Sequence, residues 1–348
     1  MTAPKPSIIA ITNEGPDWTD LDKAYGDEAW HLLLAGLEEE RHTYRAFKFY
    51  DDLSFLSRFD PREWLVWNWG EELAGKPWSD AEVAEEIERH GFAYTGSSPS
   101  TLRLTQSRHA IKERLRAAGL PTLPWRVLTD PGEAAAWHAY PAIVKGANQH
   151  ASVGLDRESV VTTGAELADR VAHLRRTIDD AALVEPFLDS REFQVAVWGN
   201  GRPEALPPSE ILFSSFDDFR DRLHTQEWKI VRESRGYREI QMPCPAPLDR
   251  PDWRARVEEI GVAAFQAFGL RDYARFDLRM LGDEPQVLDV NANPELDPLS
   301  VVVTGARVSG LTYGQMVSRI IELAALRMPA CRCPVRRGCS RNRRTRTP

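Results

Sequence analysis

The chain has 348 residues, of which 42% are hydrophobic and 28% are charged, which is the composition of an ordinary globular protein with room for two or three domains. No apolar run approaches the roughly 20 residues that a membrane span requires, and the start MTAPKPSIIAITNEG lacks the basic and apolar regions of a signal peptide. We therefore expect a cytoplasmic protein that does not span a membrane.

The net charge of -8 is unevenly distributed along the chain. The last twenty residues contain seven Arg and no acid, so the remainder is strongly acidic. An acidic body disfavours nucleic acid as a partner, because phosphate binding depends on Lys and Arg. We expect residues 329–348 to form a disordered, Arg-rich tail, although a polyanion-binding role for it stays open. Three of the four cysteines lie in this tail without the paired ligands of a zinc site, so we expect reduced thiols.

The first block, residues 1–98, alternates strand and helix patterns, as α/β proteins do. Short apolar runs at 7–12, 44–50 and 64–70 predict strands, and the run at 27–40 predicts a helix between the first two. This order predicts a small Rossmann-like domain.

A second block, residues 99–187, begins after a stretch rich in Gly, Ser and Pro. It predicts a compact domain with one long helix at 104–119 that ends on Gly119, and strands at 141–146 and 181–188.

A third block, residues 188–328, contains a long polar insertion from about 213 to 238. Two helices, at 254–269 and 312–328, flank a pair of strands. The whole chain therefore predicts an α/β (α+β) fold of three domains.

The two strands of the third block carry polar residues on one face. Alternation in ARFDLRML puts Arg275 and Asp277 on the same face. Alternation in QVLDVNAN puts Asp289 and Asn291 on the same face, opposite Leu288.

The five residues LGDEP between these strands predict a hairpin. Antiparallel closure would place Asp277 opposite Asp289 and Arg275 opposite Asn291. Opposed carboxylates are unfavourable unless a cation compensates them, and carboxylate and amide oxygens suit Mg²⁺. These residues leave an alternative equally open, namely a solvated hairpin face on which Arg275 neutralises Asp277.

A phosphate-binding element is less obvious, because the sequence contains neither GxxxxGK[ST] nor GxGxxG. Lys145 ends an apolar strand and precedes a small polar loop at 150–154 that could close over a triphosphate. Glu185 ends another strand beside backbone that could read an adenine edge, and Glu192 could accept hydrogen bonds from a ribose. Taken singly, each of these side chains is more simply explained as a surface charge.

Taken together and in order, six segments resemble the ATP-grasp enzymes, and within them the D-alanine–D-alanine ligase group. They are YTGSSPSTLRLTQSRHAIKERLRAAGLPTLPW, PAIVKGANQHASVG, LVEPFLDSREFQVAVWGNGRPEALPPSEI, ARFDLRML, VLDVNANPELDPLS and GLTYGQMVSRIIELA. The resemblance covers about residues 63–326 and implies an ATP-grasp fold whose second and third domains hold ATP between them.

The resemblance implies a role for each matching residue. The residues implied to bind the nucleotide are Arg108, Lys145, Ser152, Glu185, Phe187, Leu188, Glu192 and Lys229. Among them, Glu185 and the backbone of 186–188 would line the adenine, and Glu192 would hold the ribose. The implied magnesium ligands are Asp277, Asp289 and Asn291, and the implied catalytic residues are Arg275, Lys229 and Ser300.

The implied reaction uses ATP and two Mg²⁺ ions, for which Mn²⁺ could substitute. A substrate carboxylate takes the γ-phosphoryl group to give an acyl phosphate, and an amine then displaces phosphate. Arg275 would stand near the reacting carbonyl, Lys229 near the γ-phosphate and Ser300 near a substrate carboxylate. The implied partners are small molecules, with amino acids as the expected substrates, and homodimers are common in the family.

The sequence departs from the family pattern chiefly on the substrate side. Arg108 replaces a lysine, and both bind phosphate. The loop 150–152 reads HAS where the family has a glycine and serine run, and Glu295 replaces a glycine. The acid that binds the first D-alanine has no match unless Glu14 or Glu71 serves instead.

These departures favour an amino-acid or dipeptide ligase of secondary metabolism over the cell-wall enzyme. Glu295 and Asp297 hint at a cationic or polar second substrate. Three alternatives stay open: a ring-closing amide synthetase, a D-alanine–D-alanine ligase proper, and a nucleotide-binding protein without ligase activity.

Overall fold

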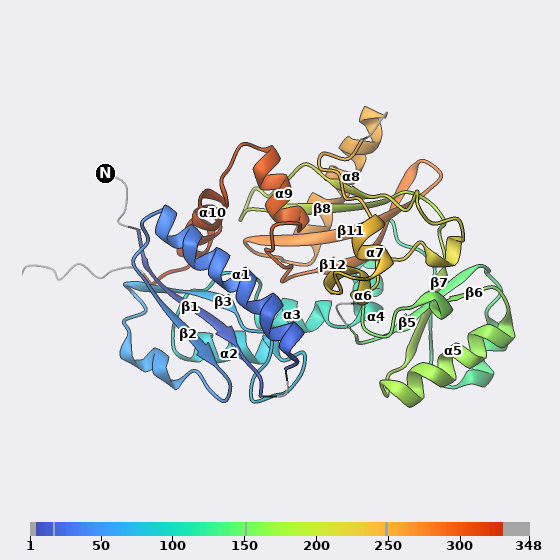
Figure 1. Cartoon of the computed structure of the whole chain (residues 1–348), viewed down its shortest axis with the longest axis horizontal. Helices are drawn as coiled ribbons and strands as arrows, with labels where there is room; N and C mark the ends of the chain where they lie inside the picture. The colour runs from blue at the N-terminus through green and yellow to red at the C-terminus, as the bar shows by residue number, and fades with distance from the viewer. Residues whose placement is uncertain (1–4, 17, 150–151, 248–249, 330–348) are drawn as a thin grey trace, which may run out of the picture.

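The computed structural model describes residues 5–16, 18–149, 152–247 and 250–329. Figure 1 shows three sheets, each with its own helices, following one another along the long axis of the molecule. None of the described helices is long and apolar enough to cross a membrane.

The N-terminal sheet has three parallel strands in the order β2-β1-β3. Its central strand is buried on both faces, as parallel strands require, and helices cover the sheet. The elements of this unit are β1 (Ser7–Asn13), α1 (Asp20–Glu39), β2 (Tyr44–Phe49), β3 (Trp64–Trp69) and α2 (Asp80–Arg89). The predicted strands and helix of the first block are therefore confirmed.

The central sheet is antiparallel, in the order β4-β7-β5-β6, with α5 packed on one face. The elements of this unit are α3 (Pro99–Thr105), α4 (Arg108–Ala117), β4 (Arg126–Leu128), β5 (Ala142–Gly146), β6 (Val160–Val161), α5 (Gly164–Thr177) and β7 (Ala182–Pro186).

The C-terminal sheet is also antiparallel, in the order β10-β8-β11-β12, and β9 pairs with β8. One face packs against α8, where Gly261 allows close approach, since a Cβ there would lie 2.9 Å from Val195. The strands are β8 (Glu192–Trp198), β9 (Glu204–Ala205), β10 (Ser209–Ile211), β11 (Tyr273–Leu281) and β12 (Glu284–Asn291). The helices are α6 (Gln226–Ile230), α7 (Arg235–Glu239), α8 (Pro251–Ala267), α9 (Val301–Val308) and α10 (Tyr313–Ala325).

The single helix predicted at 104–119 is wrong, because the chain breaks there into α3 and α4. The Ser107 hydroxyl accepts a hydrogen bond from the Ala110 amide and caps the second helix. Serine is a common N-cap residue, so Ser107 is a possible helix start. The helical spacing of apolar residues continues on both sides of Ser107, however, and therefore predicts one unbroken helix. The consequence of the break is that Arg108 becomes the first residue of α4.

The polar insertion predicted at about 213–238 is folded as short helices, namely a 3-10 turn (Phe219–Asp221), α6 and α7. Other 3-10 turns are Ser54–Arg58, Pro131–Ala136 and Arg157–Ser159. Leu223 of the insertion is buried with Ile143 and Phe187, so the insertion packs on the central unit as well as on its own sheet.

The β11–β12 hairpin confirms the predicted register, since Asp277 pairs with Asp289 and Arg275 with Asn291. The predicted five-residue connection is wrong, because Leu281 already pairs with Glu284 across a two-residue turn. The shorter turn moves the strand pairing by one residue, and a bulge opposite Asp277 and Leu278 moves it back. The predicted pairs at Asp277 and Arg275 are therefore present.

Candidate active site

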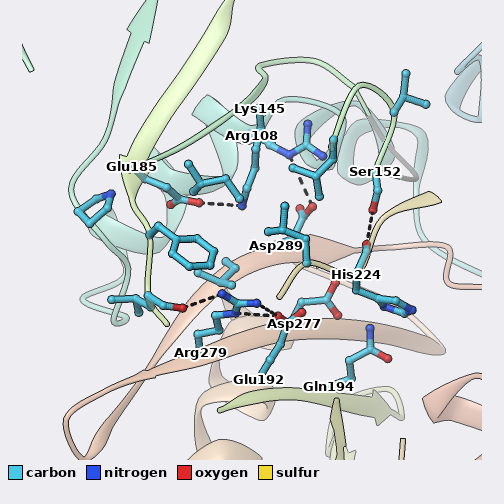
Figure 2. Close-up of a pocket in the computed structure, with 18 residues that line it drawn as sticks. Arg108, Lys145, Ser152, Glu185, Glu192, Gln194, His224, Asp277, Arg279 and Asp289 are labelled. Atoms are coloured by element: carbon cyan, nitrogen blue, oxygen red, sulfur yellow. Dashed lines mark hydrogen bonds and ion pairs between the residues drawn. The ribbon is translucent and has the colours of Figure 1, made fainter. Parts of the chain in front are cut away.

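The cavity between the central and C-terminal sheets is lined by residues of both (Figure 2). Lys145 and Arg108 lie on the upper side in this view, and Asp277, Glu192 and Gln194 lie on the lower side. The lining residues are Arg108, Ile143, Lys145, Ser152, Val153, Leu155, Glu185, Pro186, Phe187, Leu188, Glu192, Gln194, Leu223, His224, Asp277, Arg279, Leu288 and Asp289.

Strand register arranges the lower side in rows. Glu192 pairs with Arg279 in one row, and Gln194, Asp277 and Asp289 share the next row. Because side chains two residues apart on a strand share a face about 6.8 Å from each other, the rows are successive steps along the cavity. The cavity therefore has one level at Glu192 and Arg279 and a second level at the opposed carboxylates of Asp277 and Asp289.

Arg275 and Asn291 form the third row, beyond the two acids. The Arg275 guanidinium donates to both oxygens of Asp277, at 3.0 and 3.3 Å. Burial lowers the pKa of Arg275, but the charges of Asp277 and Glu295 more than offset this effect and raise it. Arg275 is thus a permanent cation next to the acid pair.

Leu288 lines the cavity together with Asp289, so the prediction that it lies on the opposite face is wrong. It is the extra residue of the bulge, because Asp277 pairs with Asp289 while Leu278 pairs with Val287. A bulge re-aims the side chains of the longer strand, which simple alternation does not anticipate.

Glu185 is clamped by two lysines. It forms ion pairs with Lys145 at 2.8 Å and with Lys112 at 2.5 Å, and both Glu185 and Lys112 are 1% exposed. Burial alone would raise the pKa of Glu185, but the charges of Lys112 and Lys145 hold it at about 2. Glu185 therefore stays ionised at neutral pH and fixes the position of Lys145.

Arg108 approaches the acid pair from the opposite side. Its guanidinium donates to the Gly146 carbonyl at 2.5 Å, and its Nε lies 3.7 Å from Asp289. The residue is buried, and its Nε has no hydrogen-bond partner within the described residues. Arg108 thus offers a buried donor beside Asp289.

The acid implied to hold a ribose is already paired in this structure. Arg279 donates to Glu192 at 2.7 Å, to the Leu188 carbonyl at 2.6 Å and to the Arg222 carbonyl at 2.5 Å. Its guanidinium also lies 5.0 Å from the Phe187 ring centre, a cation–π distance. Arg279 therefore ties together β11, the segment after β7 and the insertion.

The loop after β5 contacts the insertion over the cavity. The Ser152 hydroxyl donates to the His224 carbonyl at 3.1 Å, and both residues line the cavity. His150 and Ala151, on which part of the loop prediction falls, lie outside the described residues.

Three predicted site residues whose side chains the structure describes do not line this cavity, namely Arg275, Asn291 and Ser300. The Asn291 side-chain oxygen accepts from the Asn293 amide at 3.1 Å in the third row. The Ser300 hydroxyl caps α9 by accepting from the Val303 amide, as α9 begins at the next residue. Lys229 belongs to α6, and its side chain lies outside the described part of the chain.

Glu14 and Glu71, the two candidate acids for binding the first substrate, lie in different surroundings. Glu14 forms an ion pair with Lys48 at 2.8 Å and lies in a separate hollow of the N-terminal unit. Enclosure by protein, and then the charge of Glu295, raise the pKa of Glu71 to about 7. Because the Glu71 side chain keeps a solvent-exposed surface, water screens part of this repulsion. Of the two candidate acids, Glu71 is therefore the one whose pKa is raised by the charge of Glu295.

The residues missed from the sequence include two that line the cavity, Arg279 and Gln194, and also Lys112, which contacts Glu185 behind the lining. Strand alternation carries a signal for two of them, since Arg279 follows Asp277 by two positions and Gln194 follows Glu192 by two. Lys112 follows Arg108 by four positions on one helix, which places both on the same face.

The donor set fits a magnesium ion bound together with a polyphosphate. Asp277 and Asp289 oppose one another, and Asn291 adds an amide oxygen in the next row. No group of three or more His, Cys, Asp or Glu within the described residues could hold a metal alone. Mg²⁺ commonly takes one or two carboxylates and completes its shell with water and substrate phosphates, which matches this set.

Comparisons with known proteins identify the family of this chain. Residues 115–322 match the family model described as the D-ala D-ala ligase C-terminus. The chain is 30% identical to the D-alanine–D-alanine ligase of Desulfovibrio desulfuricans over 84% of this chain and 89% of that one. It is 31% identical to the uncharacterized protein y4sG of Sinorhizobium fredii over 78% of this chain and 80% of that one.

Two solved structures share the fold. Both are the D-alanine–D-alanine ligase of Bacillus anthracis, one of them complexed with ATP, and each has a TM-score of 0.70 at 18% identity. Each match covers 92% of this chain and 98% of the other. The three-unit α/β architecture expected from the sequence is therefore confirmed as an ATP-grasp fold.

The family model spans more than half of the chain, and the relatives at 30% identity or more match over most of both chains. The chain therefore belongs to the D-alanine–D-alanine ligase family of ATP-grasp proteins, the ATP-dependent carboxylate–amine ligases.

Proposed function

We propose that this protein uses ATP to join the carboxylate of one amino acid or dipeptide to the amine of another, through an acyl phosphate, with release of ADP and phosphate. One observation carries the proposal. Asp277 and Asp289 oppose one another in a cavity that Lys145 and Arg108 enter from the other side. Two acids facing two cations suit a polyphosphate bound with a divalent ion.

The rows of the sheet suggest how the substrates would lie. The nucleoside would occupy the level of Glu192, beside the backbone after β7 and the ring of Phe187. The phosphates would occupy the level of Asp277 and Asp289, within reach of Lys145 and Arg108. The reacting carboxylate would then lie at the level of Arg275, one row further on.

In the first step, a carboxylate oxygen forms a bond to the γ-phosphorus, and the bond from that phosphorus to the bridging oxygen of ADP breaks. Lys145 and Arg108 would neutralise charge that spreads over the phosphoryl oxygens, and this positioning supplies most of the catalysis. Bound Mg²⁺, held by Asp277, Asp289 and Asn291, would supply further charge neutralisation at the phosphates.

In the second step, the amine nitrogen bonds to the acyl carbon, phosphate leaves with the electron pair of its carbon–oxygen bond, and the nitrogen loses a proton. Arg275 would donate to the oxyanion of the tetrahedral intermediate. Such a donor is typically worth about 3 to 4 kcal/mol.

We propose further that the substrates are not two D-alanines, and that the protein acts in the cytoplasm in secondary metabolism. Glu295 occupies the position of a family glycine. Burial, and then the charge of Glu295, raise the pKa of Glu71, and the charge of Glu295 also raises the pKa of Arg275. Two acids there would favour a cationic or polar amine substrate.

The test is ATP-dependent phosphate release with amino acids screened in pairs, D-alanine with itself included. We expect release that depends on a particular carboxylate and a particular amine, and that Asp289→Asn abolishes. Release that needs only D-alanine would contradict the substrate proposal. Nucleotide binding with no amine-dependent release in any mixture would leave a binding protein without ligase activity.

A further inference from the structure

Gln194 is a buried polar side chain with no role in the account above. It is 4% exposed and lines the cavity. Figure 2 shows its amide at the floor of the cavity, with no dashed line to any drawn residue. This amide has no hydrogen-bond partner among the described residues, and because it lines the cavity, its N–H groups can donate to a ligand there.

The register places Gln194 level with the acid pair. It pairs with Asp277 on β11 and with Ser209 on β10, so the order across the sheet is Asp289, Asp277, Gln194 and Ser209. Neighbouring strands lie about 4.8 Å apart, so Gln194 is one strand spacing from Asp277 and two from Asp289. An ion held between the two acids would be nearer to them than to Gln194, whereas an oxygen of a bound phosphate chain could reach its amide.

The charge of the row favours this assignment. A third carboxylate at position 194 would repel Asp277 and any phosphate, whereas a neutral amide adds no charge and donates two N–H groups. Lys145 and Arg108 approach the same level from the other side of the cavity. A phosphate chain there would have donors on both sides.

We infer that Gln194 is a phosphate-binding residue, whose side-chain amide donates to a non-bridging oxygen beyond the α-phosphate of the bound nucleotide. This inference rests on the proposed function, because it needs a nucleotide in this cavity.

The test measures binding, not turnover, by calorimetric titration of the full chain with the non-hydrolysable analogue AMP-PNP in Mg²⁺, and with AMP. Gln194→Leu removes the amide at similar size. Gln286→Leu is the matched control, because Gln286 is 8% exposed on β12 and does not line the cavity. We expect Q194L to weaken Mg·AMP-PNP about tenfold or more and to change AMP affinity less than twofold, while Q286L changes neither.

A second variant tests whether the Gln194 side chain acts as a hydrogen-bond donor. Gln194→Glu keeps the shape but cannot donate when ionised, so we expect it to bind Mg·AMP-PNP more weakly than Q194L does. Wild-type affinity in either variant, or an equal loss for AMP, would overturn the role of Gln194. Failure of the wild-type chain to bind Mg·AMP-PNP would overturn the proposed function itself and this inference with it.

Discussion

At the scale of single residues, the least expected feature is the buried ion cluster of Lys112, Glu185 and Lys145. Lys145 and Glu185 could be selected from the sequence because each ends an apolar strand. Lys112 could not, because a lysine in RHAIKERL looks like any exposed helix charge until α4 is placed against β7 and β12. The cost of burying Glu185 is offset by both lysines, so neither can be removed without consequence.

Lys112→Met should therefore destabilise the protein by about 3 to 5 kcal/mol, because it leaves the Glu185 carboxylate buried with one partner fewer. Denaturant unfolding measures this free energy. Lys76→Met is the control, since the Lys76 side chain is 66% exposed and its pair with Glu82 is on the surface. A loss below about 1 kcal/mol in K112M would show that Glu185 does not need the second cation.

The free energy of unfolding should depend on pH in the range where Glu185 is protonated. Its pKa is lowered from the ordinary 4.5 to about 2, so the folded state binds fewer protons than the unfolded state between these values. The stabilisation is fully present above pH 4.5 and is lost as pH falls toward 2. Glu185→Gln should flatten this part of the unfolding profile, and an unchanged acid limb would contradict the assignment.

At the scale of elements, the alternation of polar and apolar residues was sufficient to predict the polar face of the β11–β12 hairpin and its register near Asp277 and Asp289. It could not predict the two-residue turn or the bulge at Leu288, because each shifts the register by one residue and the two shifts cancel. The break between α3 and α4 was missed for a related reason, since apolar periodicity continues through Ser107.

Deletion of Leu288 should remove the bulge and still leave Asp289 opposite Asp277, because Leu278 already pairs with Val287 and Asp277 with Asp289 is then the next regular pair. We expect the affinity for Mg·AMP-PNP, measured by titration, to stay within about threefold of wild type. Asp289→Ala removes the carboxylate itself and should weaken binding about tenfold or more, and circular dichroism checks that both variants fold. A comparable loss in the deletion variant would mean that the bulge, and not only the opposed acids, is needed for binding.

At the scale of the whole molecule, the insertion closes the cavity by contacting both sheets. Arg157 of the central unit forms ion pairs with Asp218 and Asp221, and Arg222 pairs with Asp189 at 2.8 Å. The sequence showed the charges of this segment but not their partners, because each pair joins residues more than 30 positions apart. Its position along the cavity, which Leu223 and His224 line, is therefore a property of the assembled fold.

Arg157→Gln should weaken nucleotide binding a few-fold with little change in thermal stability, because exposed ion pairs contribute about 0.2 to 1 kcal/mol each. Calorimetric titration and thermal unfolding measure the two effects. Arg250→Gln is the control, since Arg250 also joins two aspartates at similar exposure but lies away from the cavity. Equal effects of the two variants on binding would argue against a role for the insertion.

The most direct test of the central claim follows oxygen from the substrate carboxylate. With the amino acids that the pairwise screen identifies, the carboxylate is labelled with ¹⁸O and the phosphate released from ATP is analysed by mass spectrometry. An acyl phosphate formed beside Asp277, Asp289 and Lys145 predicts one ¹⁸O atom in each phosphate released. Label found in AMP, or unlabelled phosphate accompanying amide formation, would contradict it.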